Sequence, residues 1–415
     1  MSNSANHRIT QVLAIAAIST LFCSTAQAGG PAFTRLFGVA DSAETAVLAP
    51  AGMTRLDDSQ LIAQVILAQS FGEFEVDENL TTVSGGDPRT PDIMAVPSLY
   101  YVRPFAEDWR LGLSLMVPAG FGTSNGPNWS GRYYSDSFDL IFVSANATIA
   151  YPVTNWLSLG GGITIMGSTA DSTTQVNSLG LDEPDARLRM EAEGVAVGAI
   201  ASMMVELSPK TRFTVNWNSE VEPDEDPKVK LGRSSLPQDV VDAINDAGDD
   251  IDATIRVPQH VQMGLFHEFD NGWSATLDAI WVEFSEFGLT ELSVEGDELS
   301  ETDPNFQDFW IVSAGFGFPI SDRMEGRVGA IYVEQPVKDE DRTFSFALDK
   351  VYGAGAGIHY TRANNHSYDL NLSVFNTGDA PIDTGPLSEL SPRGRVVGET
   401  DSPYAVTLEF SYYWN

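Results

Sequence analysis

The chain has 415 residues and a formal charge of −35 at pH 7, from 58 Asp and Glu against 23 Lys and Arg. This charge argues against nucleic acid and anionic surfaces as partners, because both would repel an acidic protein. Hydrophobic residues make up 43% and aromatic residues 10% of the chain, which is too much for a disordered protein. The length allows either several average domains or one large β architecture.

Residues 1–28 have the features of an export signal. Arg8 precedes an apolar run at residues 12–22, and Ala-Gln-Ala at residues 26–28 has the form of a cleavage site. The run is too short for a membrane helix, which needs about 20 residues. We therefore predict a mature chain that starts near Gly29. Because Cys23 is the one cysteine of the sequence, that mature chain would contain neither a disulfide nor a catalytic thiol.

Residues 29–58 differ in character from the rest of the chain. They are rich in small residues, carry helix-capping side chains at Thr34 and Asp41, and are interrupted by Pro50. This pattern predicts one or two short helices rather than a pair of strands. A disordered leader is the alternative, because mature N-termini are often loose.

From residue 59 onward, apolar and polar residues alternate. In residues 211–218, for example, Phe213, Val215 and Trp217 alternate with polar residues, as in a strand with one apolar and one wet face. Fourteen such runs occur, near residues 60–71, 94–104, 109–118, 137–150, 156–167, 194–207, 211–220, 254–268, 273–287, 306–319, 324–333, 348–360, 367–375 and 404–414. No run of 18 apolar residues follows the signal, so membrane-spanning helices are not expected.

The predicted strands favour a transmembrane barrel over a soluble sandwich or propeller. Their number is even, no blade repeat occurs, and short polar turns alternate with long segments, as in outer-membrane barrels. We expect the acidic segments at residues 180–186, 220–227, 246–252 and 295–304 to be solvated extracellular loops. Aromatic residues near strand ends fit interfacial girdles; they are Tyr100, Tyr101, Trp109, Trp156, Trp217, Trp281, Tyr360 and Trp414.

The last run, residues 404–414, predicts the orientation of the wall. Leu408 and Phe410 should face hydrocarbon and Trp414 an interfacial girdle, while Glu409 and Ser411 lie on the opposite face of the strand. A barrel of fourteen strands encloses a lumen wide enough to leak solutes. Residues 29–58 could fill that lumen as a plug.

Several blocks of the sequence resemble the FadL family of outer-membrane transporters for long-chain fatty acids and other hydrophobic compounds. They are LAPAGMTRL (48–56), PSLYYVRPF (97–105), DWRLGLSLMVPAGFGT (108–123), residues 255–287 and residues 309–337. The resemblance runs over nearly the whole mature chain and implies a fourteen-stranded barrel plugged by an N-terminal hatch. The family's hatch carries an Asn-Pro-Ala motif. Ala49, Pro50 and Ala51 stand at the matching positions here, so the amide side chain is missing.

The candidate substrate-binding residues are aromatic or cationic. Aromatic side chains can hold an alkyl chain or a ring, and the loop at residues 118–137 offers Phe121, Trp129, Tyr133 and Tyr134. A ligand with a carboxylate would need a cation in the lumen, for which the candidates are Arg103, Arg132, Arg212 and Arg327. The alternatives are ordinary loop packing for the first group and ion pairs with acids such as Glu325 for the second. Residues 231–251 also predict a short amphipathic helix.

Other chemistry has little support in the sequence. His260 and His267 fall on opposite faces of one predicted strand, so no metal site is expected. No nucleophile motif of the Gly-X-Ser-X-Gly kind occurs. The glycines at 160–162 and 353–357 are expected to bend the sheet or to leave room for the plug.

The sequence thus predicts an all-β protein, a 14-stranded antiparallel transmembrane β-barrel formed by residues 59–415 with a small helical hatch at residues 29–58. We expect a monomer in the outer membrane of a Gram-negative cell, in contact with outer-membrane lipid. Its predicted function is passive uptake of long-chain fatty acids or other hydrophobic compounds, which the outer loops capture and the barrel passes on beside the hatch. No cofactor, metal, nucleic acid or enzymatic step is expected. A general diffusion porin for small polar solutes and, as a weaker case, an outer-membrane lipase are the alternatives.

Overall fold

A computed structural model describes residues 37–88, 93–105, 107–177, 185–225, 227–232, 238–247, 251–294, 297–298, 305–344, 347–362 and 366–415. The predicted signal peptide and the first residues of the predicted hatch lie outside this described part of the chain. Most of the acidic segments at 180–186 and 295–304 also lie outside it.

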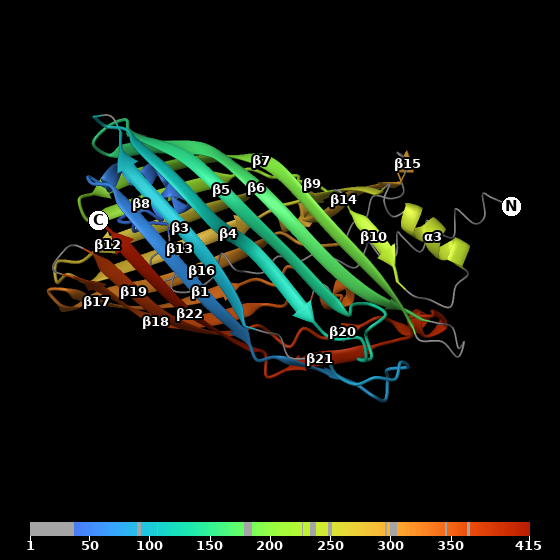
Figure 1. Cartoon of the computed structure of the whole chain (residues 1–415). Coiled ribbons are helices and arrows are strands. Elements are labelled where there is room, and N and C mark those ends of the chain that lie inside the picture. The colour runs from blue at the N-terminus through green and yellow to red at the C-terminus, as the bar shows by residue number, and fades with distance from the viewer. Residues whose placement is uncertain are drawn as a thin grey trace.

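Fourteen strands form a closed barrel in which neighbouring strands are antiparallel (Figure 1). In order around the wall they are β1 (Gln60–Ser70), β3 (Met94–Pro104), β4 (Arg110–Ser124), β5 (Ser137–Pro152), β6 (Leu157–Val176), β7 (Ala186–Ser208), β8 (Thr211–Asn218), β12 (His260–Glu268), β13 (Ser274–Val282), β16 (Phe309–Ser321), β17 (Met324–Val333), β18 (Val351–Thr361), β19 (Ser367–Asn376) and β22 (Tyr404–Trp414). Pairing of β22 with β1 closes the ring, which removes the exposed sheet edges. The predicted fold class is confirmed.

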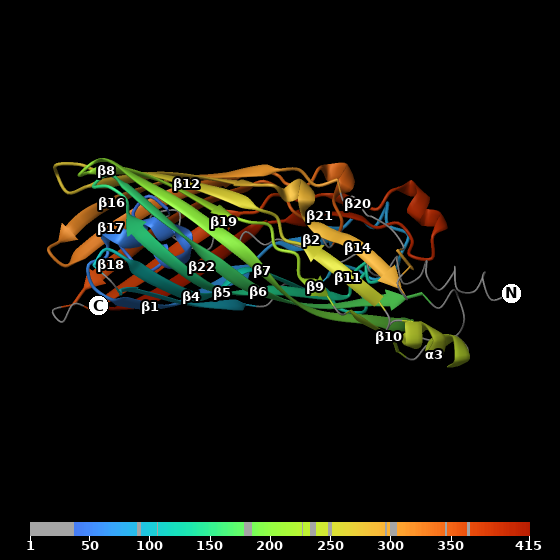
Figure 2. The ribbon, with the colours of Figure 1, turned by 90° about the horizontal axis from the view of Figure 1, so that it is seen from above.

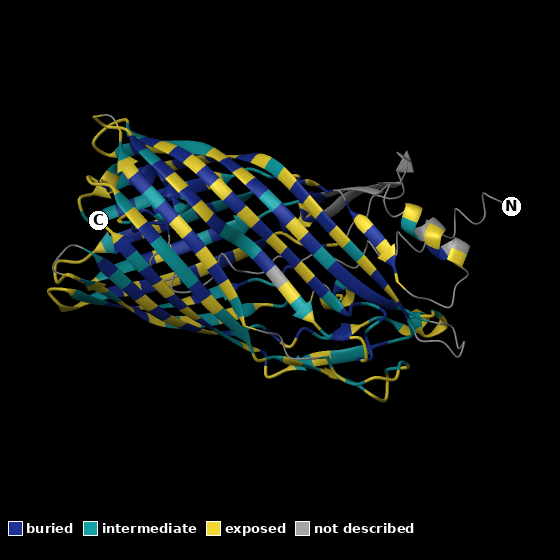
Figure 3. Cartoon of the chain, viewed as in Figure 1, coloured by how far each residue is buried: buried dark blue, intermediate teal, exposed yellow. Residues whose placement is uncertain are grey.

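Alternation along each strand gives the wall two faces (Figure 3). On β22, Leu408, Phe410 and Trp414 are 40–44% exposed, whereas Glu409 and Ser411 are at most 5% exposed. The orientation predicted for the last strand is therefore confirmed, with an apolar face outside and a polar face in the lumen.

The strand limits differ from the prediction at several places. The strand predicted at 254–268 is two strands, β11 (Ile251–Arg256) and β12, because Pro258 between them has no N–H to continue a ladder. The strand predicted at 273–287 ends at Val282, after which the chain forms the short 3-10 helix η4 (Phe284–Glu286). β6 and β7 both run past their predicted limits, so the wall is taller on their side of the barrel.

The two ends of the barrel differ (Figures 1 and 2). One end, here named the inner end, holds the C-terminus and short turns such as the one between β16 and β17. The other, the outer end, carries β9 (Asp224–Glu225), β10 (Lys228–Leu231), α3 (Gln238–Ala247), β11, β14 (Gly288–Val294) and β15 (Asp297–Glu298). It also carries a small sheet of β2 (Glu73–Val76), β21 (Val397–Asp401) and β20 (Ile382–Asp383). In outer-membrane barrels, the end with short turns faces the periplasm.

Residues 37–58, here named the lumenal segment, lie inside the barrel near its inner end (Figure 1). The segment contains α2 (Thr45–Leu48) and the 3-10 helix η3 (Pro50–Arg55), which pack against β4, β5, β6 and β7. Pro50 is the first residue of η3, where its missing N–H would have no helical partner in any case. These two short helices agree with the prediction of one or two in this region. No helix in the described part of the chain is long and apolar enough to cross a membrane.

Candidate transport path

Three glycines on the lumen face of the wall make room for the lumenal segment. A Cβ atom on Gly160 would lie 2.5 Å from the Ala51 nitrogen, and one on Gly264 would lie 2.4 Å from the Gly38 nitrogen. Gly112 likewise faces the segment. Because a side chain at these places would collide with the segment's backbone or side chains, the glycines allow close approach.

The wall holds the lumenal segment through hydrogen bonds to its backbone. Arg212, buried on β8, donates to the carbonyl oxygens of Gly38, at 2.8 Å, and of Val39. Four other side chains of the wall donate hydrogen bonds to backbone carbonyl oxygens of the segment. The donor and acceptor residues are Thr148 and Ala46 (2.6 Å), Arg110 and Leu56 (2.6 Å), Thr214 and Phe37 (2.8 Å), and Asn216 and Val47 (3.3 Å). In the opposite direction, the N–H groups of Phe37 and Ala51 donate to Asp278 (3.1 Å) and Ser202 (3.2 Å). These bonds satisfy buried backbone groups and fix the position of the segment.

The tripeptide Ala49-Pro50-Ala51 forms the bend between α2 and η3. Ala49 is non-helical, with φ −159° and ψ 71°, and its carbonyl oxygen accepts the N–H of Gly52 at 2.7 Å. All three residues of the tripeptide are buried. The bend therefore forms with alanine at the first position, where the family has asparagine.

On β5 and β19 the lumen face changes from mostly apolar to mostly polar from the outer to the inner end. On β5 the buried residues in this order are Phe138, Leu140, Phe142, Ser144, Asn146, Thr148 and Ala150. On β19 they are Phe375, Ser373, Asn371 and Asp369. The outer part also holds the stacked rings of Phe284 and Phe287, whose centroids are 4.8 Å apart. We name these two parts of the lumen the apolar level and the polar level. The lumenal segment contacts the polar level, and its Phe37 belongs to the hydrophobic cluster of the apolar level.

Arg327 on β17 is the centre of an ion-pair network in the polar level. Its side chain is 4% exposed, and it donates to Asp369 at 3.0 Å and to Glu325 at 3.3 Å. Asp369 also accepts the Tyr413 hydroxyl at 2.5 Å and lies 2.5 Å from His359 Nδ1. Arg327 is therefore neutralised by two carboxylates of the wall.

Two further carboxylates lie in the same region. Glu409 on β22 accepts a hydrogen bond from Asn371 at 3.0 Å. Glu44 of the lumenal segment accepts one from Gln64 on β1 at 3.1 Å. Both glutamates interact electrostatically with Asp369 and Arg327. Arg327 and these carboxyl groups therefore form one interacting network in the polar level.

The four arginines predicted for the lumen are found in different places. Arg212 and Arg327 face the lumen and are each 4% exposed. Arg103 is exposed on the outside of β3, since its neighbour Val102 is buried and successive residues of a strand alternate. Its expected lumenal position is thus corrected. Arg132 lies in the outer loop, 3.3 Å from Asp185.

The predicted aromatic residues of the outer loop pack against other loops. Trp129 is 3% exposed, and its indole donates to the Ser135 carbonyl at 2.7 Å. Its ring meets that of Phe344 edge to face, with centroids 5.0 Å apart, and Phe74 joins the same cluster. Trp129 therefore joins three loops into one unit.

Two tyrosines of the same loop are held by hydrogen bonds. Tyr133 donates to Asp185 at 2.7 Å, and burial together with this bond raises the pKa of Tyr133. Tyr134 donates to the carbonyl oxygen of Gly394 at 2.7 Å. Phe121 belongs to β4, where its backbone pairs with Leu140, and its side chain lies outside the described part of the structure.

The predicted amphipathic helix is shorter than expected. α3 spans Gln238–Ala247, and Val241 on it is 7% exposed. The side chain of Asn245 accepts the N–H of Leu231 at 2.7 Å, which ties the helix to β10. Leu236 and the side chains of Val240 and Ile244 lie outside the described part of the structure.

The wall contains a seam between β3 and β4. These strands pair from Leu99↔Leu115 to Pro104↔Arg110; farther out, β3 stays paired with β1 and β4 with β5. Pro97 on β3 and Pro118 on β4 lie just beyond the last pair, and neither has an N–H to offer a ladder. Pro118 also falls in a bulge between Met116 and Ala119, where strand prolines are usually found.

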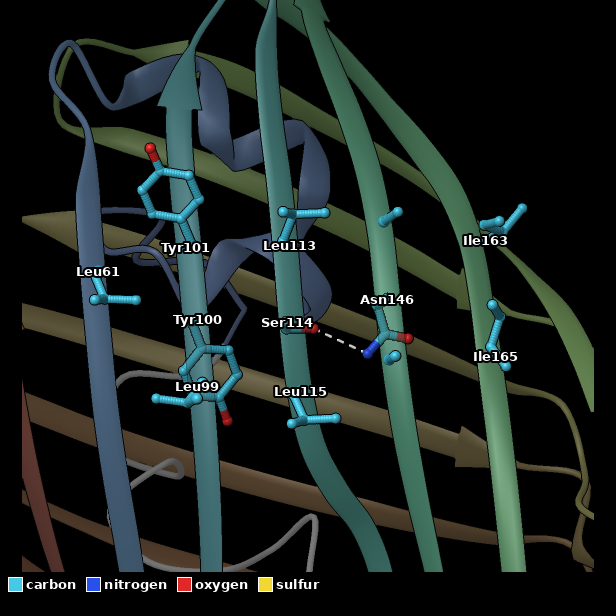
Figure 4. Close-up of a pocket in the computed structure, with 12 residues that line it drawn as sticks. Leu61, Leu99, Tyr100, Tyr101, Leu113, Ser114, Leu115, Asn146, Ile163 and Ile165 are labelled. Atoms are coloured by element: carbon cyan, nitrogen blue, oxygen red, sulfur yellow. Dashed lines mark hydrogen bonds between the residues drawn. The ribbon is translucent and has the colours of Figure 1, made fainter. Parts of the chain in front are cut away.

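An apolar groove of about 380 Å³ lies on the wall beside this seam (Figure 4). Leu113 and Leu115 of β4 and Ile163 of β6 project from the wall with the small Ala145 and Ala147 of β5 between them. The remaining lining residues are Leu61, Leu99, Tyr100, Tyr101, Ser114, Asn146 and Ile165. The groove was not predicted from the sequence, although the alternation of small and large residues between neighbouring strands and the two strand prolines were visible signals.

One arrangement in the lumen resembles a catalytic relay. Thr361 Oγ1 lies 3.3 Å from His359 Nε2, and His359 Nδ1 lies 2.5 Å from Asp369, which is the order hydroxyl, imidazole, carboxylate. Asp369, however, is also bound by Arg327 and Tyr413, as in a structural ion-pair network. Within the described residues, no group of three or more His, Cys, Asp or Glu is placed to hold a metal ion.

Comparison with known proteins relates this fold to a transport family. Residues 9–413 match the family model described as outer membrane protein transport protein (OMPP1/FadL/TodX). The long-chain fatty acid transport protein of Escherichia coli (strain K12) is 22% identical over 399 residues, which covers 86% of this chain and 87% of that protein. Outer membrane protein P1 of Haemophilus influenzae is 20% identical over 380 residues, which covers 84% of this chain and 79% of that protein.

Solved structures share the fold. A Pseudomonas aeruginosa FadL homologue superimposes with a TM-score of 0.77 at 17% identity, covering 92% of this chain and 95% of that chain. The P. putida toluene transporter TodX superimposes with a TM-score of 0.62 at 15% identity, covering 89% and 93% of the two chains. Since the family model matches nearly the whole sequence and the closed barrel has the same fold, this chain belongs to the OMPP1/FadL/TodX family of outer-membrane transport proteins.

Proposed function

We propose that this protein imports hydrophobic molecules, either long-chain fatty acids or other hydrophobic compounds, and that residues 29–58 form its hatch. One observation supports this most strongly: the lumenal segment occupies the lumen, while the wall has a seam beside an apolar, lipid-facing groove. A polar solute needs a continuous aqueous channel. An apolar molecule can instead leave sideways into hydrocarbon.

In this proposal, cargo first meets the outer loop around Trp129, Tyr133 and Tyr134 and the outer part of β4 at Phe121. It then passes the phenylalanines of the apolar level, where its contacts are favourable because apolar surface leaves water. A shift of the lumenal segment near Pro50 opens the way to the seam between β3 and β4. The printed names of two relatives, a long-chain fatty acid transport protein and a toluene transporter, support a hydrophobic cargo.

The porin alternative is disfavoured by the position of the lumenal segment. A general porin would show a steady ion conductance in a planar bilayer. With residues 37–58 hydrogen-bonded across the lumen, we expect little conductance from the purified protein.

The lipase alternative rests on Thr361, His359 and Asp369. We interpret this relay as structural because the Asp369 carboxylate is shared with Arg327 and Tyr413. Purified protein should then release no fatty acid from phospholipid or ester substrates. Release of fatty acid by the native protein that is lost in His359→Ala would support the lipase alternative.

The central experiment measures uptake of labelled oleate and labelled toluene by cells that lack their own transporter of this family. A variant with Ala51→Cys and Ser202→Cys is designed to lock the hatch, because the two residues are adjacent, with the Ala51 nitrogen 3.2 Å from the Ser202 hydroxyl. Loss of both free thiols on oxidation shows that the disulfide has formed. We expect uptake of at least one cargo by the native protein, loss of that uptake when the variant is oxidised, and recovery on reduction. Equal uptake by oxidised and reduced variant would exclude hatch movement. If the native protein takes up neither cargo, the porin becomes the leading interpretation.

A further inference from the structure

The positive charges of the lumen are already used by the protein. On the barrel strands that the structure describes, the lumen-facing arginines are Arg110, Arg212 and Arg327. Arg110 donates to the Leu56 carbonyl, and Arg212 donates to carbonyl oxygens of the lumenal segment while its guanidinium lies 3.9 Å from the centre of the Phe266 ring. Arg327 is paired with two carboxylates. Its Nη2 is buried and has no hydrogen-bond partner among the described residues. A carboxylate arriving in the lumen would therefore have to compete with Asp369 and Glu325 for this guanidinium.

The lumen also contains buried acidic groups, and a buried site disfavours negative charge. Glu44 and Glu409 lie in the electrostatic field of Asp369, and Asp278 is 2% exposed where it accepts the N–H of Phe37. Repulsion between like charges is strong in a buried site, because little water screens it. The polar level, through which cargo must pass beside the hatch, therefore disfavours a negative group.

Three arginines of the outer mouth are also paired with acids. Arg132 is paired with Asp185 at 3.3 Å. Arg342, whose side chain is fully buried, lies 2.9 Å from Asp339. Arg395 is paired with Asp383 at 2.8 Å and with Glu389 at 3.2 Å. With a formal charge of −35 on the whole chain, the protein's field would lower the local concentration of anions at this mouth.

The groove at the proposed exit carries no charge. Its lining residues are aliphatic, aromatic or neutral and polar, and none of them is Lys, Arg, Asp or Glu. A molecule with no ionic group can occupy it without losing hydration of a charge.

We propose that the cargo of this protein is uncharged: a hydrocarbon or another neutral hydrophobic molecule, and not the anion of a fatty acid. This inference rests on the proposed import function and narrows its substrate class. The apolar level and the groove supply the contacts. The arginines that are already bonded, together with the buried carboxyl groups, supply the discrimination against an anion.

The test compares two molecules of equal chain length that differ in charge. Initial uptake of labelled oleate and labelled methyl oleate is measured in cells that lack their own transporter of this family, with and without the full chain. We expect the protein to raise methyl oleate uptake about tenfold and oleate uptake less than about twofold. A comparable increase for both, or for oleate alone, overturns the inference and leaves the import function standing. An increase for neither overturns the import function itself.

A charge variant tests whether the pairing of Arg327 causes the discrimination between oleate and methyl oleate. Asp369→Asn together with Glu325→Gln keeps the shape of both partners, removes two negative charges and leaves the guanidinium available to an anion. We expect oleate uptake to rise about tenfold relative to the native protein, and the addition of Arg327→Gln to abolish that gain. A folded variant without any gain contradicts the assigned role of this network.

Asp270→Asn is the matched control for lost negative charge. Asp270 is paired with Lys210 at 2.7 Å on an exposed turn at the inner end, away from the lumen, so oleate uptake should not change. Folding of each variant is checked by the heat-dependent shift of the barrel in gel electrophoresis. If the double variant does not fold, the comparison of oleate with methyl oleate in the native protein still decides the inference.

Discussion

Two strand junctions in the wall differ in their pairing. Between β1 and β22, the first and last strands of the barrel, ten consecutive residue pairs run from Leu61↔Trp414 to Ser70↔Ala405. Between β3 and β4, which follow each other in the sequence, six pairs form and the strands then separate. No proline lies in the first ladder, whereas Pro97 and Pro118 follow the end of the second.

The difference shows that separation along the chain does not weaken a ladder once the barrel has formed. A loss of backbone N–H donors does weaken a ladder, since each proline removes one donor. The weaker junction is also the one beside the apolar groove. In the proposed route, β1 and β22 keep the wall closed, and β3 and β4 let cargo leave.

A cross-link across the seam should have the largest effect on uptake. Ser98→Cys and Met116→Cys would place two thiols next to the last seam pair, both on the lumen face. A short bismaleimide should lower uptake more than about tenfold, because the strands could no longer part. The control joins Ala68→Cys to Thr407→Cys, a pair in the β1–β22 ladder, and should leave uptake unchanged. A similar loss in both would mean that the two junctions do not differ in function.

Restoring donors to the seam should have the next largest effect. With Pro97→Val and Pro118→Val, the ladder can extend outward, each new hydrogen bond adding about 1 kcal/mol of stability. We expect the thermal midpoint to rise and uptake to fall about fivefold. Pro104→Val, at the paired inner end of the same ladder, should leave uptake at the native level. Unchanged uptake in a more stable double variant would argue that cargo leaves elsewhere.

Filling the groove should have a moderate effect. Ala145→Leu with Ala147→Leu adds bulk between the large residues of β4 and β6. Because leucine is compatible with a lipid-facing position, we expect normal folding and about threefold slower uptake. Ala354→Leu with Ala356→Leu makes the same change on the outer face of β18 and should not slow uptake. Equal slowing by both pairs would point to a general effect of bulk on the wall.

A charge on the closed junction should change stability and leave transport intact. Phe410→Arg would put a guanidinium on the lipid face of β22, which costs about 2 kcal/mol or more near the membrane centre. We expect a lower urea midpoint for the barrel in lipid vesicles. Uptake per folded molecule should match the native protein, and a marked loss would assign the closed junction a role in transport.

The wall was well predicted from the sequence because lumen and lipid impose a period of two. The strands at 324–333 and 404–414 have the predicted limits. Alternation alone could not mark the interruption at Pro258, where the pattern continues although the ladder stops. The alternation also did not predict the strands β9, β10 and β14 of the outer end. These strands pair with their neighbours beyond the main barrel and lie within or beside acidic segments.

The site was less predictable because it depends on contacts between distant loops. Tyr134 was recognised as an aromatic loop residue, but its partner Gly394 is 260 positions away, and no local pattern reveals such a pair. The outward position of Arg103 followed from the alternation with Val102 and was available from the sequence. The prolines of the seam were equally visible, inside two predicted strands. Gly160 was expected to make room for the plug, whereas Gly357 faces Asn371 of the adjacent strand.

The anchoring of the lumenal segment has an evolutionary consequence. Arg212, Thr148 and Arg110 recognise carbonyl oxygens, a feature that every residue possesses. The barrel can therefore retain its segment while the side chains of that segment diverge, provided that the backbone still fits against Gly160 and Gly264. Alanine at position 49 is one such change, and a segment transplanted from a distant relative should seat in this wall.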